Sequence, residues 1–178
     1  MFIYENIGFR PIDAEDIERL RDLHNEMTTL LQLGSVEMFS SEEQMEWWKY
    51  ISRSNTSKLC SIVDTENKKI MGIIRIQNID VSNRNCEIGL DIIPSYRGQG
   101  YGYKSYMMLM EYLFLHFNMN MVYLRVGGFN DKAKALYEKL HFIETGRYKE
   151  YLYRKGRYWD YILMTMTKAQ YMKHFVAK

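Results

Sequence analysis

The chemistry-bearing residues of this chain gather in the segment EIGLDIIPSYRGQGYGY, which runs from Glu87 to Tyr103. Within it, Arg97 is followed by Gly100 and Gly102 in the spacing R-x-x-G-x-G. Glycines let the chain turn tightly and let a ligand approach the backbone, and the free N–H groups at the start of a helix favour an anion. The segment therefore predicts a phosphate site, and the pyrophosphate of a nucleotide-like cofactor is the ligand that suits it.

The glycine pattern matches neither of two common nucleotide motifs. The dinucleotide fingerprint G-x-G-x-x-G would need a third glycine where Tyr103 stands. The same tyrosine breaks the P-loop pattern G-x-x-x-x-G-K-[ST], although Lys104 and Ser105 follow it. A plain flexible turn is the alternative, so the residues around the segment must decide.

Two carboxylates precede the glycine turn. Along a strand, Glu87, Gly89 and Asp91 share one face. A carboxylate beside a cofactor site could act as a general base, directly or through a water, and Glu87 is the first candidate for it. An ordinary polar residue on the solvent face of a strand is the alternative.

A second group of candidate residues lies further along the chain. Asn130 and Tyr137 are seven residues apart, so two helical turns place them on one face. Asn130 also suits the N-cap of that helix, and Tyr137 suits its amphipathic surface. Either residue therefore has a structural explanation when it is considered alone.

Hydrophobic patterns predict the elements that must position these residues. Strands are expected at Ile7–Arg10, Leu59–Asp64, Lys69–Ile79, Cys86–Ile93, Met121–Val126, Thr145–Tyr153 and Arg157–Met166. Helices are expected at about Ala14–Glu26, from Ser40 or Ser41 to about Ser52, from the glycine turn to about Asn118, and from Asn130 to near Leu140, whereas Met27–Phe39 is expected to be irregular. This order predicts an α/β (α+β) fold with a mixed, mostly antiparallel sheet of about seven strands and helices on both faces.

Length and composition limit the function classes. The 178 residues suit one domain, 1–178, and the net charge of +2 gives no bulk electrostatic reason to bind nucleic acid or an acidic membrane. No apolar run is long enough to span a membrane. Cys60 and Cys86 lack a metal-ligand or disulfide spacing, so we expect buried free thiols, no metal and a reducing, cytoplasmic location.

Taken together, EIGLDIIPSYRGQGYG and NDKAKALYEKLHF resemble the GNAT superfamily of acyl-CoA-dependent N-acetyltransferases. The resemblance covers roughly Lys69–Met166. It implies a sheet with a splayed strand pair at the cofactor cleft, acetyl-CoA as the cofactor, and direct attack by an amine without a covalent enzyme intermediate or a metal.

The resemblance also implies a role for individual residues. Tyr137 would be the general acid and Glu87 the base, although a water chain is the alternative to Glu87. The cofactor would be bound by Ile92 and Ile93 on the strand, by Arg97, Gly98, Gln99, Gly100, Tyr101, Gly102 and Tyr103 at the turn, and by Asn130. His141 departs from the family, which commonly has Gly there, and a left-handed conformation suits His less well than Gly.

The acceptor is less defined than the cofactor. The hairpin GRYKEYLYRKGRYWDYILM, with Gly156, Arg157, Tyr158 and Asp160, resembles the end of spermidine and ribosomal-protein N-terminal acetyltransferases. A polycation needs a strongly acidic cleft, and the expected acceptor loop Met27–Phe39 holds only Glu37 as an acid. We therefore expect a small amine or an amino-sugar nucleotide, which Trp47 and Trp48 could stack against unless they pack in the core.

Three alternatives stay open. A polyamine, a peptide or protein N-terminus, and a non-catalytic acyl-CoA sensor remain alternatives to a small amine acceptor. A homodimer is one expected assembly.

Overall fold

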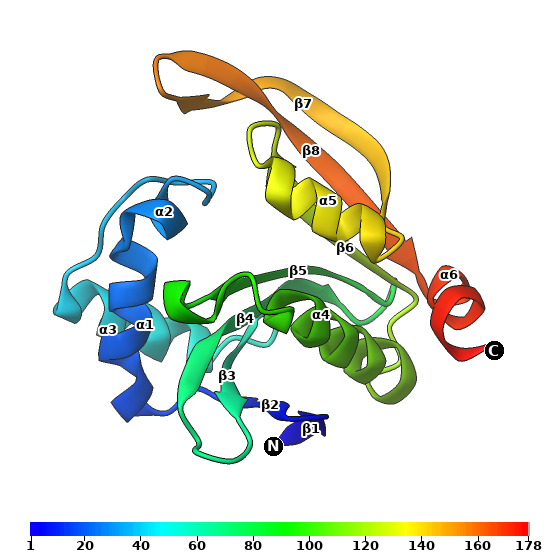
Figure 1. Ribbon diagram of the computed structural model, residues 1–178, viewed down its shortest axis with the longest axis horizontal. Coiled ribbons are helices and arrows are strands. Elements are labelled where there is room, and N and C mark those ends of the chain that lie inside the picture. Colours follow the sequence, from blue (N-terminus) through cyan, green and yellow to red (C-terminus); the bar gives the residue numbers. More distant parts are fainter. Residues whose placement is uncertain (178) are drawn as a thin grey trace.

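A computed structural model describes residues 1–177, which build one eight-stranded sheet in the order β1-β2-β3-β4-β5-β6-β8-β7 (Figure 1). All neighbouring strands are antiparallel except β5 and β6, which are parallel. The strands are β1 (Phe2–Tyr4), β2 (Ile7–Pro11), β3 (Lys58–Asp64), β4 (Ile70–Asp80), β5 (Asn85–Ile92), β6 (Met121–Gly127), β7 (Ile143–Arg154) and β8 (Arg157–Thr167). The predicted fold is confirmed, with β1 as an eighth strand that the sequence analysis did not find.

Six α-helices connect and flank the strands. They are α1 (Ile17–Asn25), α2 (Met27–Leu30), α3 (Ser41–Ser52), α4 (Tyr101–Glu111), α5 (Asp131–Lys139) and α6 (Lys168–Tyr171). A 3-10 turn (Ala14–Asp16) precedes α1, another (Pro94–Tyr96) follows β5, and π-helical turns extend α4 (Tyr112–His116) and α6 (Met172–Val176). The expected irregular segment Met27–Phe39 thus contains the short α2, and the C-terminal α6 was not expected.

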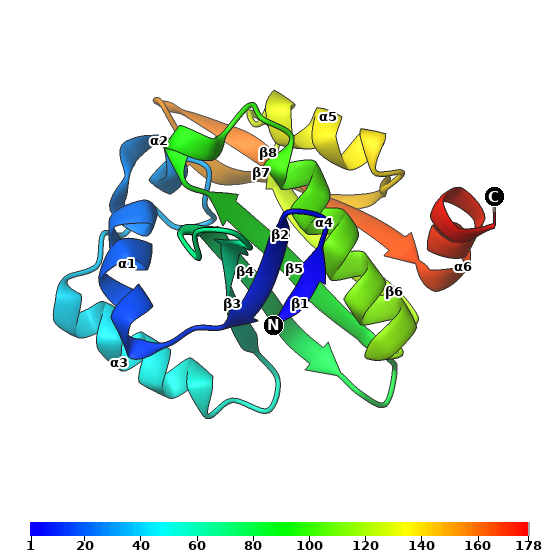
Figure 2. The same cartoon turned by 60° about the horizontal axis from the view of Figure 1, so that its bottom comes forward.

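The sheet opens between β5 and β6 (Figures 1 and 2). Their backbones pair only where Asn85–Glu87 lie opposite Met121–Tyr123, although both strands continue beyond these residues. The predicted splayed strand pair is therefore confirmed. Each strand presents backbone polar groups to the gap along the part that has no partner.

Helices cover both faces of the sheet because neighbouring strand residues point to opposite sides. On β4, Ile74 belongs to the large core under α4 and α5, whereas Ile73 belongs to a smaller core under α1 and α3. Trp47 and Trp48 pack against the smaller core. Met107, Met110 and Phe114 of α4 and its extension are buried in the large core, whereas Phe117 after the extension is 40 % exposed.

Asp16 ties the start of α1 to the sheet. It is 1 % exposed and accepts hydrogen bonds from Arg10 at 2.6 and 2.8 Å, from Ser61 Oγ at 2.8 Å and from the Asp13 amide at 3.0 Å. Burial alone would raise the pKa of Asp16, but these donors hold it below the ordinary value. The buried charge is thus stabilised by donors from β2, β3 and the turn before α1.

Candidate active site

The glycine turn between β5 and α4 exposes a row of backbone amides. Gly98 and Gly100 have φ of +75° and +83°, a conformation that side chains rarely adopt, and a Cβ at either residue would meet nothing within 4 Å. No described residue accepts a hydrogen bond from the amides of residues 98–103, and α4 has no side-chain cap. Free amides at a helix start next to open space fit the phosphates of an acyl-CoA.

Arg97 does not extend freely from this turn. Its Nε donates to the Ile92 carbonyl at 2.7 Å, and its two Nη atoms donate to Thr28 and Thr29 at 2.6 and 2.5 Å. Glu26 lies 3.7 Å from the same guanidinium. Arg97 therefore joins the glycine turn to α2 and adds its charge at the edge of the predicted phosphate site.

Glu26 completes this connection from the side of α2. It accepts hydrogen bonds from the amides and hydroxyls of Thr28 and Thr29. Burial would raise the pKa of Glu26, but these hydrogen bonds outweigh it and lower the pKa to about 2. Glu26 is consequently a carboxylate at neutral pH and a fixed cap of α2.

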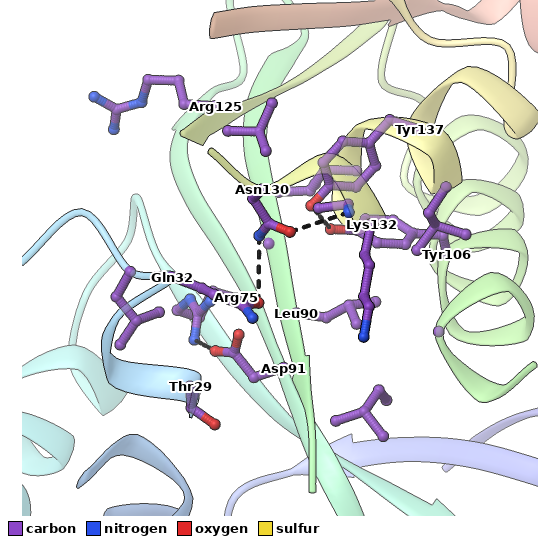
Figure 3. A pocket seen from close by; sticks show the side chains of 18 of the residues that line it. Thr29, Gln32, Arg75, Leu90, Asp91, Tyr106, Arg125, Asn130, Lys132 and Tyr137 are labelled. Carbon is purple, nitrogen blue, oxygen red and sulfur yellow. Dashed lines mark hydrogen bonds and ion pairs between the residues drawn. The ribbon is translucent and has the colours of Figure 1, made fainter. Parts of the chain in front are cut away.

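The gap between β5 and β6 opens into a cavity of about 860 Å³ (Figure 3). Of the predicted site residues, the cavity is lined by Glu87, Ile92, Arg97, Gly98, Gly102, Asn130 and Tyr137. Gln99, Gly100, Tyr101 and Tyr103 belong to the adjoining turn and first helical residues. Ile93 is not brought to the cavity, since its amide donates to Met71, its carbonyl accepts from Tyr96, and its side chain packs against the smaller core.

Tyr137 presents its hydroxyl at this cavity from α5. The hydroxyl lies 3.1 Å from that of Tyr106 on α4, which is 1 % exposed (Figure 3). Burial raises the pKa of Tyr137, although the hydrogen bond with Tyr106 counters part of the rise. The Tyr137 hydroxyl therefore keeps its proton at physiological pH.

Glu87 lies where β5 and β6 separate. Arg125 on β6 donates to both carboxylate oxygens at 2.8 Å, and Asn78 adds a hydrogen bond of 2.9 Å. The Glu87–Arg125 ion pair thus bridges the two strands beside their last paired residues. Both oxygens already accept hydrogen bonds, so a proton from an amine would have to displace one of these donors.

A second ion pair, between Asp91 and Arg75, lies deeper along β5. Arg75 Nη1 donates to Asp91 Oδ2 at 2.5 Å, while no described residue donates to Oδ1. Burial opposes the charge of Arg75, but Asp91 keeps the pKa of Arg75 raised. The guanidinium also lies 3.4 Å from the position of a Cβ at Gly89, so the glycine leaves room for it.

Asn130 links the two sides of the cavity. Its Oδ1 caps α5 by accepting from the Ala133 amide at 3.1 Å, as predicted. Its Nδ2 donates to Gln32 Oε1 at 3.3 Å, across to the segment after α2 (Figure 3). Gln32, Arg75 and Tyr106 were not predicted as site residues, because nothing in their local sequence patterns distinguishes them from surface or core residues.

Two further expectations concern His141 and Asp160, which do not line the cavity. His141 has φ of +62°, the left-handed conformation in which the family commonly places Gly, and it stacks on His174 at 4.0 Å. Asp160 pairs with Arg147 and Lys149 at 3.1 and 3.0 Å and accepts from the Glu150 amide at 3.1 Å, whereas Arg157 lies over the Trp159 ring.

Neither metal ligands nor reactive thiols are found in the described part of the chain. Residues 1–177 hold no group of three His, Cys, Asp or Glu side chains arranged for a metal. Cys60 and Cys86 are buried, and burial raises their pKa values to about 11 and about 12, so neither is a thiolate at neutral pH. Within the same residues no helix has the length and apolar character of a membrane span.

Comparisons with known proteins agree with this geometry. The family model of the acetyltransferase (GNAT) domain matches residues 6–143. The chain is 28 % identical to the uncharacterized prophage N-acetyltransferase YokL of Bacillus subtilis, over 94 % of this chain and 93 % of that protein. It is 25 % identical to spermidine N(1)-acetyltransferase of Vibrio cholerae, over 93 % of this chain and 95 % of that protein.

A solved structure shares the fold. The Vibrio cholerae spermidine N-acetyltransferase in complex with CoA and spermine superposes with a TM-score of 0.89, at 24 % identity, over 95 % of this chain and 99 % of that one. The matched domain includes the glycine turn, Asn130 and Tyr137. The chain therefore belongs to the GNAT superfamily of acetyl-CoA-dependent N-acetyltransferases.

Proposed function

We propose that this protein transfers the acetyl group of acetyl-CoA directly to the primary amine of a small molecule, with Tyr137 as the proton donor. The observation that carries the proposal is the Tyr137 hydroxyl, neutral and supported by Tyr106 at 3.1 Å, on the cavity between the splayed strands. The free amides at the start of α4 lie at the same cleft. The start of α4 thus suits the phosphates of acetyl-CoA, and Tyr137 on α5 suits its thioester.

The residues fit the donor in two places. The amides of residues 98–103 would hold the pyrophosphate, with the guanidinium of Arg97 fixed at the edge of the site by Ile92, Thr28 and Thr29. The unpaired stretches of β5 and β6, together with Asn130, would hold the extended arm by backbone hydrogen bonds. When bound, acetyl-CoA supplies an activated thioester.

Two proton movements accompany the transfer. The amine nitrogen forms the new amide bond and loses one proton, while the bond to sulfur breaks and sulfur takes a proton from Tyr137. Tyr106 is placed to stabilise the resulting tyrosinate through the hydroxyl–hydroxyl contact. No covalent bond to the enzyme is needed.

The proton of the amine leaves through Glu87 or through water. Glu87 lines the cavity, which supports the role, but Arg125 and Asn78 occupy both of its oxygens. A water chain avoids breaking these contacts. Comparison of kcat between variants at Glu87 and Arg125 separates the two routes.

The charges of the cavity favour an acceptor with few positive charges. Arg75, Arg97, Arg125 and Lys132 line it with only two carboxylates, Glu87 and Asp91, each paired to an arginine. A polycation would gain little from such walls. A polyamine is nevertheless the second candidate acceptor, because spermidine acetyltransferases match nearly the whole chain.

The other acceptors, the cellular location and the oligomeric state are further parts of the proposal. An amino-sugar nucleotide and a peptide N-terminus stay predictions, as do the cytoplasmic location and the homodimer. A neighbouring structure of the Vibrio cholerae enzyme is described as dodecameric, so oligomers larger than a dimer occur among proteins of this fold. The oligomeric state of this chain can be measured by light scattering.

Release of free CoA from acetyl-CoA, measured with a thiol reagent against a panel of amines, tests the proposal. Tyr137→Phe should lower kcat by about 10²–10⁴-fold and leave the affinity for CoA unchanged. Tyr148→Phe, the same change on the exposed β7 hairpin, is the matched control. Tight CoA binding without turnover of any amine would favour the sensor, and an unchanged kcat in Tyr137→Phe would refute the general acid.

A further inference from the structure

A second, smaller cavity of about 200 Å³ lies between α1, α3 and the sheet. Its apolar walls are Leu20, Leu23, Leu33, Phe39, Trp47 and Ile73. An engineered cavity of about 150 Å³ with similar walls binds benzene. The small cavity is therefore large enough for one ring or a short branched chain.

The small cavity adjoins the active-site cavity. Leu33, Arg75 and Asp91 line both, so the Arg75–Asp91 ion pair marks their boundary. Asp91 Oδ2 accepts from Arg75, and Oδ1 is without a donor among the described residues. A carboxylate oxygen is thus available at the boundary to hold an ammonium group.

Gln44 on α3 gives the small cavity a polar feature that the fold does not explain. Gln44 is 3 % exposed. Its Oε1 is one of only two buried side-chain nitrogen or oxygen atoms in residues 1–177 that lack a hydrogen-bond partner. A buried acceptor without a donor is destabilising and rare in native proteins. Because Gln44 lines the cavity, a ligand carrying an O–H or N–H group could supply the missing donor.

The rim of the small cavity is held in place before any ligand binds. Asn25 makes two hydrogen bonds with the backbone of Phe39, at 2.7 and 2.9 Å. His24 stacks on the Phe39 ring at 4.6 Å, and its Nε2 lies 3.0 Å from the Glu37 carbonyl. A preformed, mostly apolar cavity with a few convergent polar groups is typical of a binding site.

We propose that the small cavity is the subsite for the non-reacting part of the acceptor, an apolar ring or chain that ends in a neutral hydrogen-bond donor. The ring lies between Phe39 and Trp47, its donor bonds Gln44 Oε1, and the primary amine lies at Asp91, directed toward the active-site cavity. This rests on the acetyl transfer proposed above and names its substrate class. A hydroxylated arylalkylamine has this chemistry, and tyramine is a suitable probe.

The same features exclude a polyamine from the small cavity. A second ammonium group there would lie among six apolar side chains, and a buried unpaired charge is strongly unfavourable. Spermidine would thus have to bind entirely in the active-site cavity. The subsite therefore predicts a preference for an amine with a single charge.

Steady-state rates with tyramine, phenethylamine, ethylamine and spermidine test the subsite. We expect kcat/KM to be highest for tyramine, about 10-fold lower for phenethylamine, which lacks the hydroxyl, and lower still for ethylamine and spermidine. Gln44→Met, which removes the acceptor at similar volume, should lower kcat/KM for tyramine about 10-fold and leave phenethylamine unchanged. Glu46→Met, on the exposed face of the same helix, should change neither rate.

Stability and binding measurements make the test independent of turnover. Gln44→Met should melt at the same temperature as the wild type or higher, because it removes a buried unpaired oxygen. If no amine is acetylated, the proposed function fails, and calorimetric binding of tyramine then decides the subsite. Binding that Gln44→Met weakens and Glu46→Met does not would support it, whereas no tyramine binding would overturn it.

One result would overturn the subsite and keep the acetyltransferase. Turnover of spermidine or ethylamine as efficient as that of tyramine would show that the small cavity takes no part in acceptor binding. Leu33→Trp offers a second variant, since Leu33 lines both cavities and a larger side chain there should block passage between them. It should abolish the preference for tyramine over ethylamine, and a retained preference would contradict the proposal.

Discussion

Replacement of Glu87 by Gln breaks the ion pair at the point where β5 and β6 separate. The Glu87 side chain is 11 % exposed and receives two hydrogen bonds of 2.8 Å from Arg125, whose side chain is 34 % exposed. Gln keeps one acceptor oxygen, so the substitution removes the charge and about one of the two bonds. We expect the two strands to lose a large part of their connection there.

The magnitude follows from the number of bonds and their exposure. A hydrogen bond to a charged group contributes about 1.5–3 kcal/mol, and the partial exposure of Arg125 reduces this. We expect Glu87→Gln to lower the free energy of unfolding by about 2 kcal/mol. For a chain of this size that corresponds to a fall in Tm of about 4–8 °C.

A double-mutant cycle provides the assay. Glu87→Gln, Arg125→Met and the double variant are compared by urea unfolding, and the coupling energy should be about 1–2 kcal/mol. Both single variants should lower kcat to a similar, modest extent. Purely additive stabilities would refute the structural role, and a kcat loss of about 10²–10⁴-fold in Glu87→Gln alone would identify Glu87 as the base.

Three further predictions concern the cofactor site, the proton donor and the buried Asp16. Gly100→Asp should weaken CoA binding about 100-fold, measured by calorimetry; a Cβ there meets nothing within 4 Å, so the cost to folding is the positive φ alone, which Asp and Asn share. Gly100→Asn, without the charge, should weaken binding far less, and equal losses would contradict the electrostatic reason. The pKa of Tyr137 is raised from 10.0, so the proton-donor limb of the kcat profile should fall only above pH 10; a fall near pH 8 would contradict Tyr137 as the acid. The pKa of Asp16 is lowered from 3.8, so its contribution is complete above about pH 4 and is lost as pH falls through the folded-state value. Asp16→Asn should lower the free energy of unfolding by about 2–3 kcal/mol at pH 7 and should weaken its dependence on pH below about pH 4. An unchanged pH dependence in that range would refute this.

The sequence predicted the parts of the site that depend on neighbours in the chain. Gly98, Gly100 and the start of α4 form one continuous turn, and Asn130 and Tyr137 occupy one helix. Local spacing is enough to find such residues. The capping box of Ser40 and Glu43 was predictable for the same reason.

The missed parts depend on contacts between distant segments. Arg75 meets Asp91 only because β4 and β5 pair, and Arg125 reaches Glu87 only because two strands far apart in the sequence adjoin. Arg97 was predicted as a phosphate ligand, but in the folded chain its guanidinium donates hydrogen bonds to Thr28 and Thr29 of α2. β1 and α2 are too short to show a periodic hydrophobic pattern. Pairing with β2 defines β1, and the Glu26 cap defines α2.

The opening between β5 and β6 also separates the N-terminal part of the chain from the C-terminal part. The β1–β5 half-sheet carries the amides predicted to hold the phosphates, and the β6–β8 half-sheet with α5 carries Tyr137. The two halves meet in the backbone through three residue pairs, through the amides of Asn120 and Met121 that donate to the Arg84 carbonyl, and through the connection at 118–120, in which Asn118 and Asn120 are exposed. Two separately expressed fragments cut at this connection would each bring one half of the reaction, so acetyl transfer would report their reassembly.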